Sequence, residues 1–160
     1  IEERNLLSQD DACLQPMEDL IHIFLDASKM ITKFESAMDQ IVLSLKTTYP
    51  SIELKKSPLK LLYRTMEKMA FSTTYLNRAD GVLDIVRCRF ICDSVKTMVG
   101  VLSFIFDSEL FEFVRFKDRW RHPTTAGWAD FMINVYLKNE ASRHKCEIQI
   151  THKLMMAVSK

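Results

Sequence analysis

One helical pattern in the N-terminal part of the chain constrains the fold more than any other feature. The apolar residues there recur in alternating steps of four and three, at Leu20, Phe24, Ala27, Ile31, Phe34, Met38, Ile41 and Leu45. This spacing keeps one face of a helix buried and predicts a helix from about Met17 to Leu45. Further apolar residues widen that face beyond the seam of a two-stranded coiled coil. We therefore expect the helix to pack on a sheet of its own domain.

Three shorter helices are expected further along the chain. Ser57 can cap free backbone N–H groups and Pro58 suits the first helical position, so a second helix should run to about Phe71. Its apolar face would contain Leu59, Leu62, Tyr63, Met66 and Ala70. The same periodicity predicts helices over Val95–Phe106 and Thr151–Val158.

Runs rich in β-branched and apolar residues follow the second helix. They predict strands over Leu83–Asp93, Leu110–Phe116, Ala129–Leu137 and Lys145–Ile150. Helices and strands together indicate an α/β (α+β) fold, with a mixed, mostly five-stranded sheet flanked by helices. The 160 residues, 48% of them hydrophobic, suffice for one core, so we expect a single domain over 1–160. Its helical part would be 1–50 and its core 54–160, and the absence of an initiating Met suggests a piece of a longer protein.

Charge and cysteine usage narrow the functional classes. The net charge is only +1, from 22 basic and 21 acidic residues, which argues against a broad surface for duplex nucleic acid. The four cysteines lack metal-ligand spacing, and Cys88 and Cys92 lie in a strand-like run, so we expect buried thiols in a reducing compartment and no zinc. There is neither a long apolar run nor a signal-peptide pattern, which predicts a cytoplasmic protein without a membrane span.

Polar residues occupy alternate positions of two predicted strands. Asp130 and Asn134 lie on one strand, and Glu147 and Gln149 lie on the other. Because alternate side chains of a strand point to the same side, these four groups should converge on one face of the sheet. The histidines His122, His144 and His152 lack a recurring acidic or cysteine partner, and we expect them at the surface.

Several cations stand close to these strands in sequence. Arg87 and Arg89 lie within an apolar run, where burial is costly unless an anionic group pairs with them. The second helix adds a basic stripe at four-residue intervals, made of Lys56, Lys60, Arg64 and Lys68. Taken alone, such a stripe is typical of a solvated helix face.

These residues resemble the motifs of RelA/SpoT-type alarmone synthetases. The run Asp84–Arg89 resembles the D-x-x-G-x-R strand of that family, and Lys56-Ser57-Pro58 with Arg64 resembles its K-S-x-x-S-x-x-x-K helix start. The family's K-D-Y, P-K-x-N-G-Y and E-[VI]-Q-I-R segments are resembled, in order, by Lys117-Asp118, by Pro123 with Gly127-Trp128, and by Glu147–Ile150. The resemblance spans Leu54–Lys160 in the expected order, which makes it more specific than any single motif.

The resemblance implies a nucleotidyltransferase-like fold and a Mg²⁺-dependent transfer of pyrophosphate from ATP to the ribose 3′-hydroxyl of GDP, GTP or another acceptor. Asp84 and Glu147 would be the catalytic and metal-binding acids, since carboxylates are suitable hard-oxygen ligands for Mg²⁺. Glu147 could instead accept the proton of the attacking hydroxyl.

The remaining site residues divide into two groups. Cations would clamp the phosphates of ATP, namely Lys56, Arg64, Arg89, Lys117, Arg119 and Arg121. The acceptor would be bound by Trp128, Asp130, Asn134 and Gln149, with Trp128 stacking on a purine.

The chain also departs from the family at five positions. It has Leu54, Thr124, Ala126, Met132 and Thr151 where the family has, respectively, Arg, Lys, Asn, usually His, and Arg. Each lost charge-assisted contact typically costs about 1.5–3 kcal/mol, which weighs against the unmodified family reaction. Two functions therefore stay open, a divergent pyrophosphokinase and a catalytically silent domain that senses nucleotides or binds partners. RNA binding, including tRNA as acceptor, is a third and weaker idea.

Overall fold

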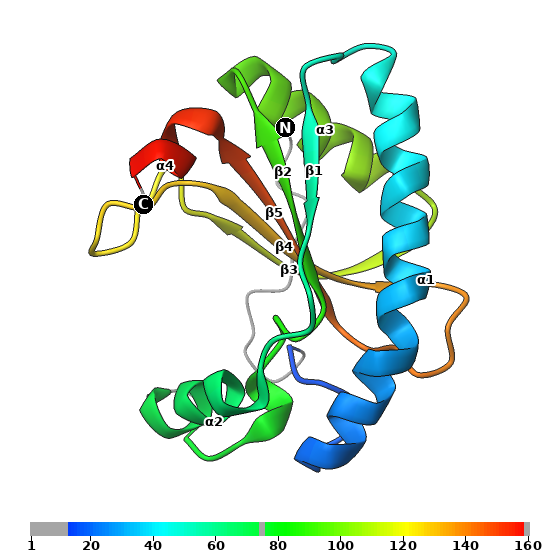
Figure 1. The fold of residues 1–160 in the computed structure, drawn as a ribbon, viewed down its shortest axis with the longest axis vertical. Helices are drawn as coiled ribbons and strands as arrows, with labels where there is room; N and C mark the ends of the chain where they lie inside the picture. The colour runs from blue at the N-terminus through cyan, green and yellow to red at the C-terminus, as the bar shows by residue number, and fades with distance from the viewer. Residues whose placement is uncertain (1–12, 74–75, 159–160) are drawn as a thin grey trace.

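The computed structural model describes residues 13–73 and 76–158, which form one mixed sheet with helices around it (Figure 1). The strands are β1 (Glu53–Lys56), β2 (Arg87–Cys92), β3 (Phe111–Asp118), β4 (Phe131–Leu137) and β5 (Cys146–His152). Their order in the sheet is β1-β2-β5-β4-β3. Only β2 and β5 are parallel, and every other neighbouring pair is antiparallel. The predicted mixed five-stranded sheet is confirmed, and β1 is the strand that the sequence did not locate.

The long N-terminal helix is present as α1 (Leu20–Lys46). It begins three residues later than expected because Asp19 caps it, accepting a hydrogen bond from the backbone N–H of His22 at 2.9 Å. The helix α3 (Val95–Asp107) begins in the same way at Ser94, whose side chain accepts from the N–H of Thr97 at 3.1 Å. Both helices bury their apolar sides in the main core together with one face of the sheet. Figure 1 shows α1 alongside β1, with α3 near the C-terminal end of α1.

The second helix differs from the prediction. The helix α2 spans Leu62–Phe71, and neither Ser57 nor Pro58 starts it. Instead, β1 is paired with β2, and the N–H of Lys60 donates to the carbonyl of Ile85 at 3.0 Å, so this segment runs extended along the core before the helix begins.

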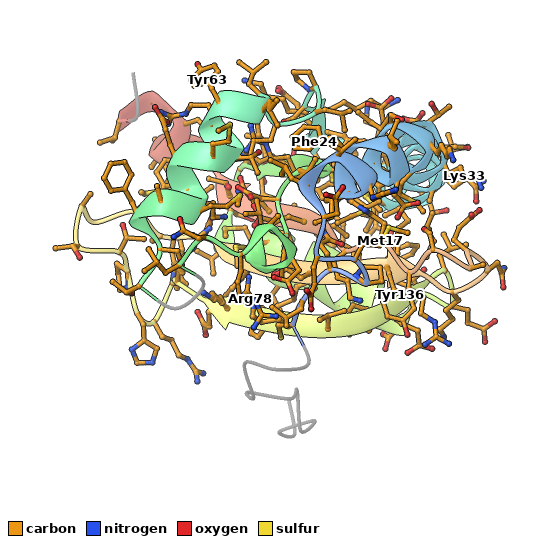
Figure 2. All side chains as sticks on the ribbon, turned by 90° about the horizontal axis from the view of Figure 1, so that it is seen from below. Met17, Phe24, Lys33, Tyr63, Arg78 and Tyr136 are labelled. Atoms are coloured by element: carbon orange, nitrogen blue, oxygen red, sulfur yellow. The ribbon has the colours of Figure 1, made fainter. Side chains whose placement is uncertain are left out.

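Most of the predicted apolar face of α2 is also exposed. Only Thr65 of this helix is buried, while Tyr63 and Met66 are 58% and 54% exposed. Figure 2 shows Tyr63 at the outer edge of the molecule.

Two further boundaries shift. The strand predicted over Leu83–Asp93 begins only at Arg87, so Asp84 lies in the irregular segment that precedes β2. The alternation rule that would place Asp84 and Arg89 on opposite faces therefore does not apply to Asp84. The last helix, α4 (Lys153–Val158), starts two residues later than expected because β5 continues to His152.

The strand register separates an apolar face from a polar face. On the apolar face, Cys88 pairs with Ile148 and Phe90 with Ile150, and all four side chains are buried in the core. The polar residues alternate with them and lie on the opposite face, as predicted. The four cysteines are buried free thiols, which confirms the expectation for Cys88 and Cys92.

His144 is not a surface residue, and this prediction was wrong. Its side chain is 1% exposed and its Nδ1 lies 3.4 Å from Oδ2 of Asp26 on α1. Burial lowers the pKa of His144 to about 4, although the charge of Asp26 opposes this shift. No local pattern indicates this contact, because more than a hundred residues separate His144 from Asp26. His122 is exposed and His152 is partly exposed.

Among the helices of residues 13–73 and 76–158, none is both long and apolar enough to cross a lipid bilayer.

Candidate functional site

Two acidic residues lie near the start of the neighbouring strands β2 and β5. Asp84 lies three residues before β2, and Glu147 is the second residue of β5. The parallel pairing aligns Arg87 with Glu147, and the N–H of Glu147 donates to the carbonyl of Val86 at 2.9 Å. Both acids are largely buried, at 8% and 5% exposure. The predicted pair is thus brought together from positions far apart in the chain.

Asp84 is surrounded by cations. Its Oδ2 accepts from Nζ of Lys60 at 2.7 Å and its Oδ1 from Nζ of Lys68 at 2.9 Å, while Arg87 Nη1 lies 3.7 Å from Oδ2. Burial alone would raise the pKa of Asp84, but the charges and hydrogen bonds of the two lysines outweigh burial and hold the pKa below its usual value. Asp84 is therefore ionised.

The pKa of Glu147 is shifted in the opposite direction. Burial raises its pKa, and the neighbouring negative charge of Asp84 raises it further. A hydrogen bond from Gln149 Nε2 to Glu147 Oε1, at 2.6 Å, and the charges of Lys68 and Arg119 oppose the shift without cancelling it. Two adjacent carboxylates with pKa values displaced in opposite directions are typical of functional sites.

Two rows of side chains cross the polar face of the sheet. The pairing places Arg89, Gln149, Met132 and Lys117 in one row, and Arg87, Glu147, Asn134 and Arg115 in the next. Burial lowers the pKa of Lys117, and the charges of Arg115, Arg119 and Lys68 lower it further. This concentration of cations favours binding of a polyanion on this face.

Arg89 connects Glu147, by way of Gln149, to an aromatic side chain. Its Nε donates to Gln149 Oε1 at 2.8 Å, its Nη2 donates to the same oxygen, and Gln149 in turn donates to Glu147. The guanidinium carbon of Arg89 lies 5.4 Å from the ring centroid of Trp128, within the range of a cation–π contact. The indole N–H of Trp128 donates to Asp130.

Asn134 is fully buried on the same face. Its Oδ1 accepts from Nε of Arg115 at 3.0 Å, and its Nδ2 has no hydrogen-bond partner among the described residues. A buried donor without a partner is costly, which makes the Asn134 amide a candidate ligand-binding group beside Glu147.

Three of the predicted phosphate-binding residues stand apart from this cluster. Lys56 points to the opposite face of the sheet, where its Nζ binds Asp39 of α1 at 2.7 Å. Arg64 is paired with Glu67 on the surface of α2. Arg121 is 82% exposed in its side chain and lies 3.5 Å from Asp118.

Other cations take positions that the sequence reasoning did not assign. Lys60 and Lys68 hold Asp84, and Arg87 and Arg115 line the polar face. The four-residue spacing of Arg64 and Lys68 places these two cations on one side of α2. Lys60 lies in the extended segment just before the helix and reaches Asp84 from there. These three residues, with Glu67 and Phe71, line a hollow of about 520 Å³ next to Asp84.

The acidic pair fits a magnesium ion by its donor chemistry. Mg²⁺ is usually held by one or two carboxylates together with water and substrate phosphates. Asp84 and Glu147 supply two carboxylates, and the negative charge of Asp84 adds to burial in raising the pKa of Glu147. A divalent cation would relieve the repulsion between these two carboxylates.

Solved structures of small alarmone synthetases share this fold. Small alarmone synthetase 1 from Bacillus subtilis, bound to its product pppGpp, has a TM-score of 0.71 at 19% identity, over 85% of this chain and 75% of that chain. Small alarmone synthetase 2 from Bacillus subtilis has a TM-score of 0.69 at 18% identity, over 89% and 77% of the two chains. A GTP pyrophosphokinase family protein from Streptococcus pneumoniae has a TM-score of 0.60 at 17% identity, over 86% of this chain and 69% of that chain. At these identities the likeness establishes the fold, and it confirms the predicted fold class.

Sequence comparison supplies the family. No curated protein matches this chain. A family model described as a region found in RelA / SpoT proteins matches residues 57–160, which is well over half of the chain. It includes both acids and both rows of the polar face. The chain therefore belongs to the RelA/SpoT family.

Proposed function

We propose that this chain is a divergent, Mg²⁺-dependent pyrophosphokinase that transfers pyrophosphate from ATP to a ribose 3′-hydroxyl of a guanine nucleotide or of another nucleotide or RNA acceptor. One observation carries this proposal. Two buried carboxylates, Asp84 and Glu147, are near enough for the charge of Asp84 to raise the pKa of Glu147, and two lysines form ion pairs with Asp84 and hold its pKa low. Membership of the RelA/SpoT family supports it.

The acids have distinct parts in this reaction. The acceptor oxygen forms a bond to the β-phosphorus of ATP, the bond from that phosphorus to the oxygen bridging the α-phosphate breaks, and AMP leaves. Asp84 and Glu147 would hold Mg²⁺, which neutralises charge on the transferred group when bound. Glu147 is also the candidate to accept the proton of the attacking hydroxyl, because its raised pKa moves it toward neutral pH, where a general base works best.

The cations would bind phosphate oxygens. Lys60 and Lys68 border the hollow beside Asp84 and are better placed for ATP than Lys56, which is paired on the other face of the sheet. Arg64 can join them by leaving its exposed partner Glu67. When Lys60 and Lys68 bind the phosphates of ATP, Asp84 loses its ion pairs with them and becomes available to the metal ion.

The acceptor would lie further along the polar face. The resemblance assigned Arg89, Lys117, Arg119 and Arg121 to the phosphates of ATP. We assign them instead to the phosphates of the acceptor, because Arg89 and Lys117 lie on the strands of the polar face, whereas Lys60 and Lys68 border the hollow beside Asp84; Arg121 would reach these phosphates only at the rim. Trp128 offers a ring for stacking, and Gln149 offers hydrogen bonds to ribose or base. Asn134 has an amide Nδ2 without a hydrogen-bond partner among the described residues, but it is 0% exposed and would reach the acceptor only after neighbouring side chains move.

A second function, a silent domain that binds nucleotides without turnover, is favoured by one specific observation. Asp84 is already neutralised by two lysines, each at hydrogen-bond distance. If ATP does not displace them, the acidic pair cannot hold a metal ion, and the site would bind anions only.

The test is a product assay. The protein is incubated with Mg²⁺, ATP and each of GDP, GTP, ADP and deacylated tRNA, and the products are resolved by mass spectrometry. We expect one acceptor to gain pyrophosphate with equimolar AMP, and both products to vanish in Glu147→Gln and Asp84→Asn. Glu112→Gln is the matched control, since this exposed carboxylate lies on β3 and pairs only weakly with Lys138 at 3.8 Å. ATP binding by calorimetry without AMP from any acceptor would instead support the silent domain.

A further inference from the structure

Both carboxylate oxygens of Asp130 accept hydrogen bonds from neighbouring side chains. This residue lies immediately before β4 and is 0% exposed. Its Oδ1 accepts from Nε of Arg119 at 2.6 Å, and its Oδ2 accepts from Nη2 of Arg119 at 2.8 Å and from Nε1 of Trp128 at 2.8 Å. The backbone adds a further bond, from the N–H of Arg119 to the carbonyl of Asp130 at 3.0 Å. Asp130 thus has no exposed surface with which to touch a ligand.

These contacts fix two groups that would meet the acceptor. The two-pronged bond to Asp130 sets the plane of the Arg119 guanidinium, since an arginine fork and a carboxylate match in geometry. The bond to the indole N–H sets the edge of the Trp128 ring, and Arg89 lies over one face of that ring at 5.4 Å. Trp128 is therefore held at its edge and on one face, and it remains partly exposed.

We propose that Asp130 is a positioning residue, which holds Trp128 and Arg119 in place for the acceptor without contacting it. This proposal rests on the proposed function, because it takes Trp128 and Arg119 to be acceptor-side groups. A pre-set ring and guanidinium lose less conformational freedom when the acceptor binds, so affinity is gained without a new contact. ATP binds through Lys60 and Lys68 in this scheme, so its affinity should not depend on Asp130.

The first test separates the two substrates. Asp130→Asn keeps the side-chain shape but replaces one accepting oxygen with a donating amide, which opposes the N–H groups that now point at it. We expect the KM for the acceptor to rise about tenfold or more, as for loss of a hydrogen bond to a charged group, and the KM for ATP to stay within about twofold. Equal changes in both KM values would overturn the proposal.

A double-mutant cycle tests the route of the effect. Trp128→Phe keeps a stacking ring and removes the N–H that Asp130 accepts. If Asp130 acts through Trp128, Asp130→Asn should raise the acceptor KM less in the Trp128→Phe protein than in the parent. Fully additive effects of the two substitutions would contradict this route.

A third measurement needs no catalysis. The chain has two tryptophans, so Trp120→Phe leaves Trp128 as the single tryptophan, which can be excited selectively over the tyrosines. In that protein we expect Asp130→Asn to raise quenching of Trp128 by acrylamide at least about twofold and to lower its anisotropy, because the ring loses its anchor. Glu112→Gln in the same background should change neither. Unchanged fluorescence in folded Asp130→Asn would refute the positioning role.

The product assay and the fluorescence measurement test the proposed function and the role of Asp130 separately. Failure to form any product, with the expected fluorescence change, would reject the pyrophosphokinase but keep the anchoring of Trp128. Normal product formation, with unchanged fluorescence and KM values in Asp130→Asn, would support the pyrophosphokinase and reject the positioning role of Asp130. If Asp130→Asn does not fold, as judged by circular dichroism, Arg119→Lys removes the fork while keeping a positive charge. The same rise in acceptor KM is then expected, and its absence would overturn the proposal.

Discussion

Replacing Lys60 with methionine should measure what the ion pair with Asp84 contributes to stability. Lys60 Nζ lies 2.7 Å from Asp84 Oδ2, and the two side chains are only 13% and 11% exposed. Complete loss of partners around a buried charge costs about 3–5 kcal/mol, whereas a single hydrogen bond to a charged group contributes about 1.5–3 kcal/mol. Asp84 keeps Lys68 at 2.9 Å in the variant, so the lower range applies. We expect Lys60→Met to lower the free energy of unfolding by about 2 kcal/mol.

Urea unfolding at neutral pH measures this change, and its pH dependence tests the cause. The folded pKa of Asp84 lies below its ordinary value of 3.8. The contribution of the ion pair is therefore fully present above that value and is lost as pH falls through the lowered pKa. The difference between the parent and Lys60→Met should shrink in acid, because protonated Asp84 no longer needs its lysine.

Lys56→Met is the matched control. Lys56 makes an ion pair of the same length, 2.7 Å to Asp39, but the two side chains are 39% and 59% exposed. Water and salt screen such a pair, so we expect no measurable loss of stability. Equal losses for Lys56→Met and Lys60→Met would refute the reasoning, since burial would then not decide the strength of the pair.

Three further predictions follow from the structure. Asp84→Asn should lower the pKa of Glu147, because it removes a neighbouring negative charge, and an unchanged carboxyl titration by ¹³C NMR would contradict this. His144 has a folded pKa of about 4 against an ordinary value of 6.5, so the unfolded state takes up the proton first and stability falls as pH drops between these values. His144→Leu should flatten that part of the pH profile in urea unfolding, and a profile as steep as the parent's would count against it. Gly100→Ala should destabilise the domain by about 1–3 kcal/mol, because a Cβ there would lie 2.1 Å from Tyr49 Oη and 2.4 Å from its Cζ. Thermal melting checks this loss, which should largely disappear in a Tyr49→Ala background.

Several elements of the fold could be predicted from the sequence, since their patterns repeat within one segment. The four-and-three spacing gave α1, with only its start displaced by the cap at Asp19. Alternation along β4 and β5 correctly placed Asn134 and Glu147 on one face. The start of α2 could not be predicted in this way, because pairing of β1 with β2 overrode the local signal of Ser57 and Pro58.

The sequence by itself determined which chemical groups the polar face would carry, because strand alternation is a local property of the backbone. It also showed the family through the order of its motifs. The partners of those groups were decided only by the tertiary structure. The parallel pairing of β2 with β5 placed Asp84 near Glu147. Lys60, in the segment before α2, and Lys68, on α2 itself, both form hydrogen bonds with Asp84, whereas Lys56 binds Asp39 of α1. Contacts between residues so far apart depend on strand order and helix placement, which no short window of sequence contains.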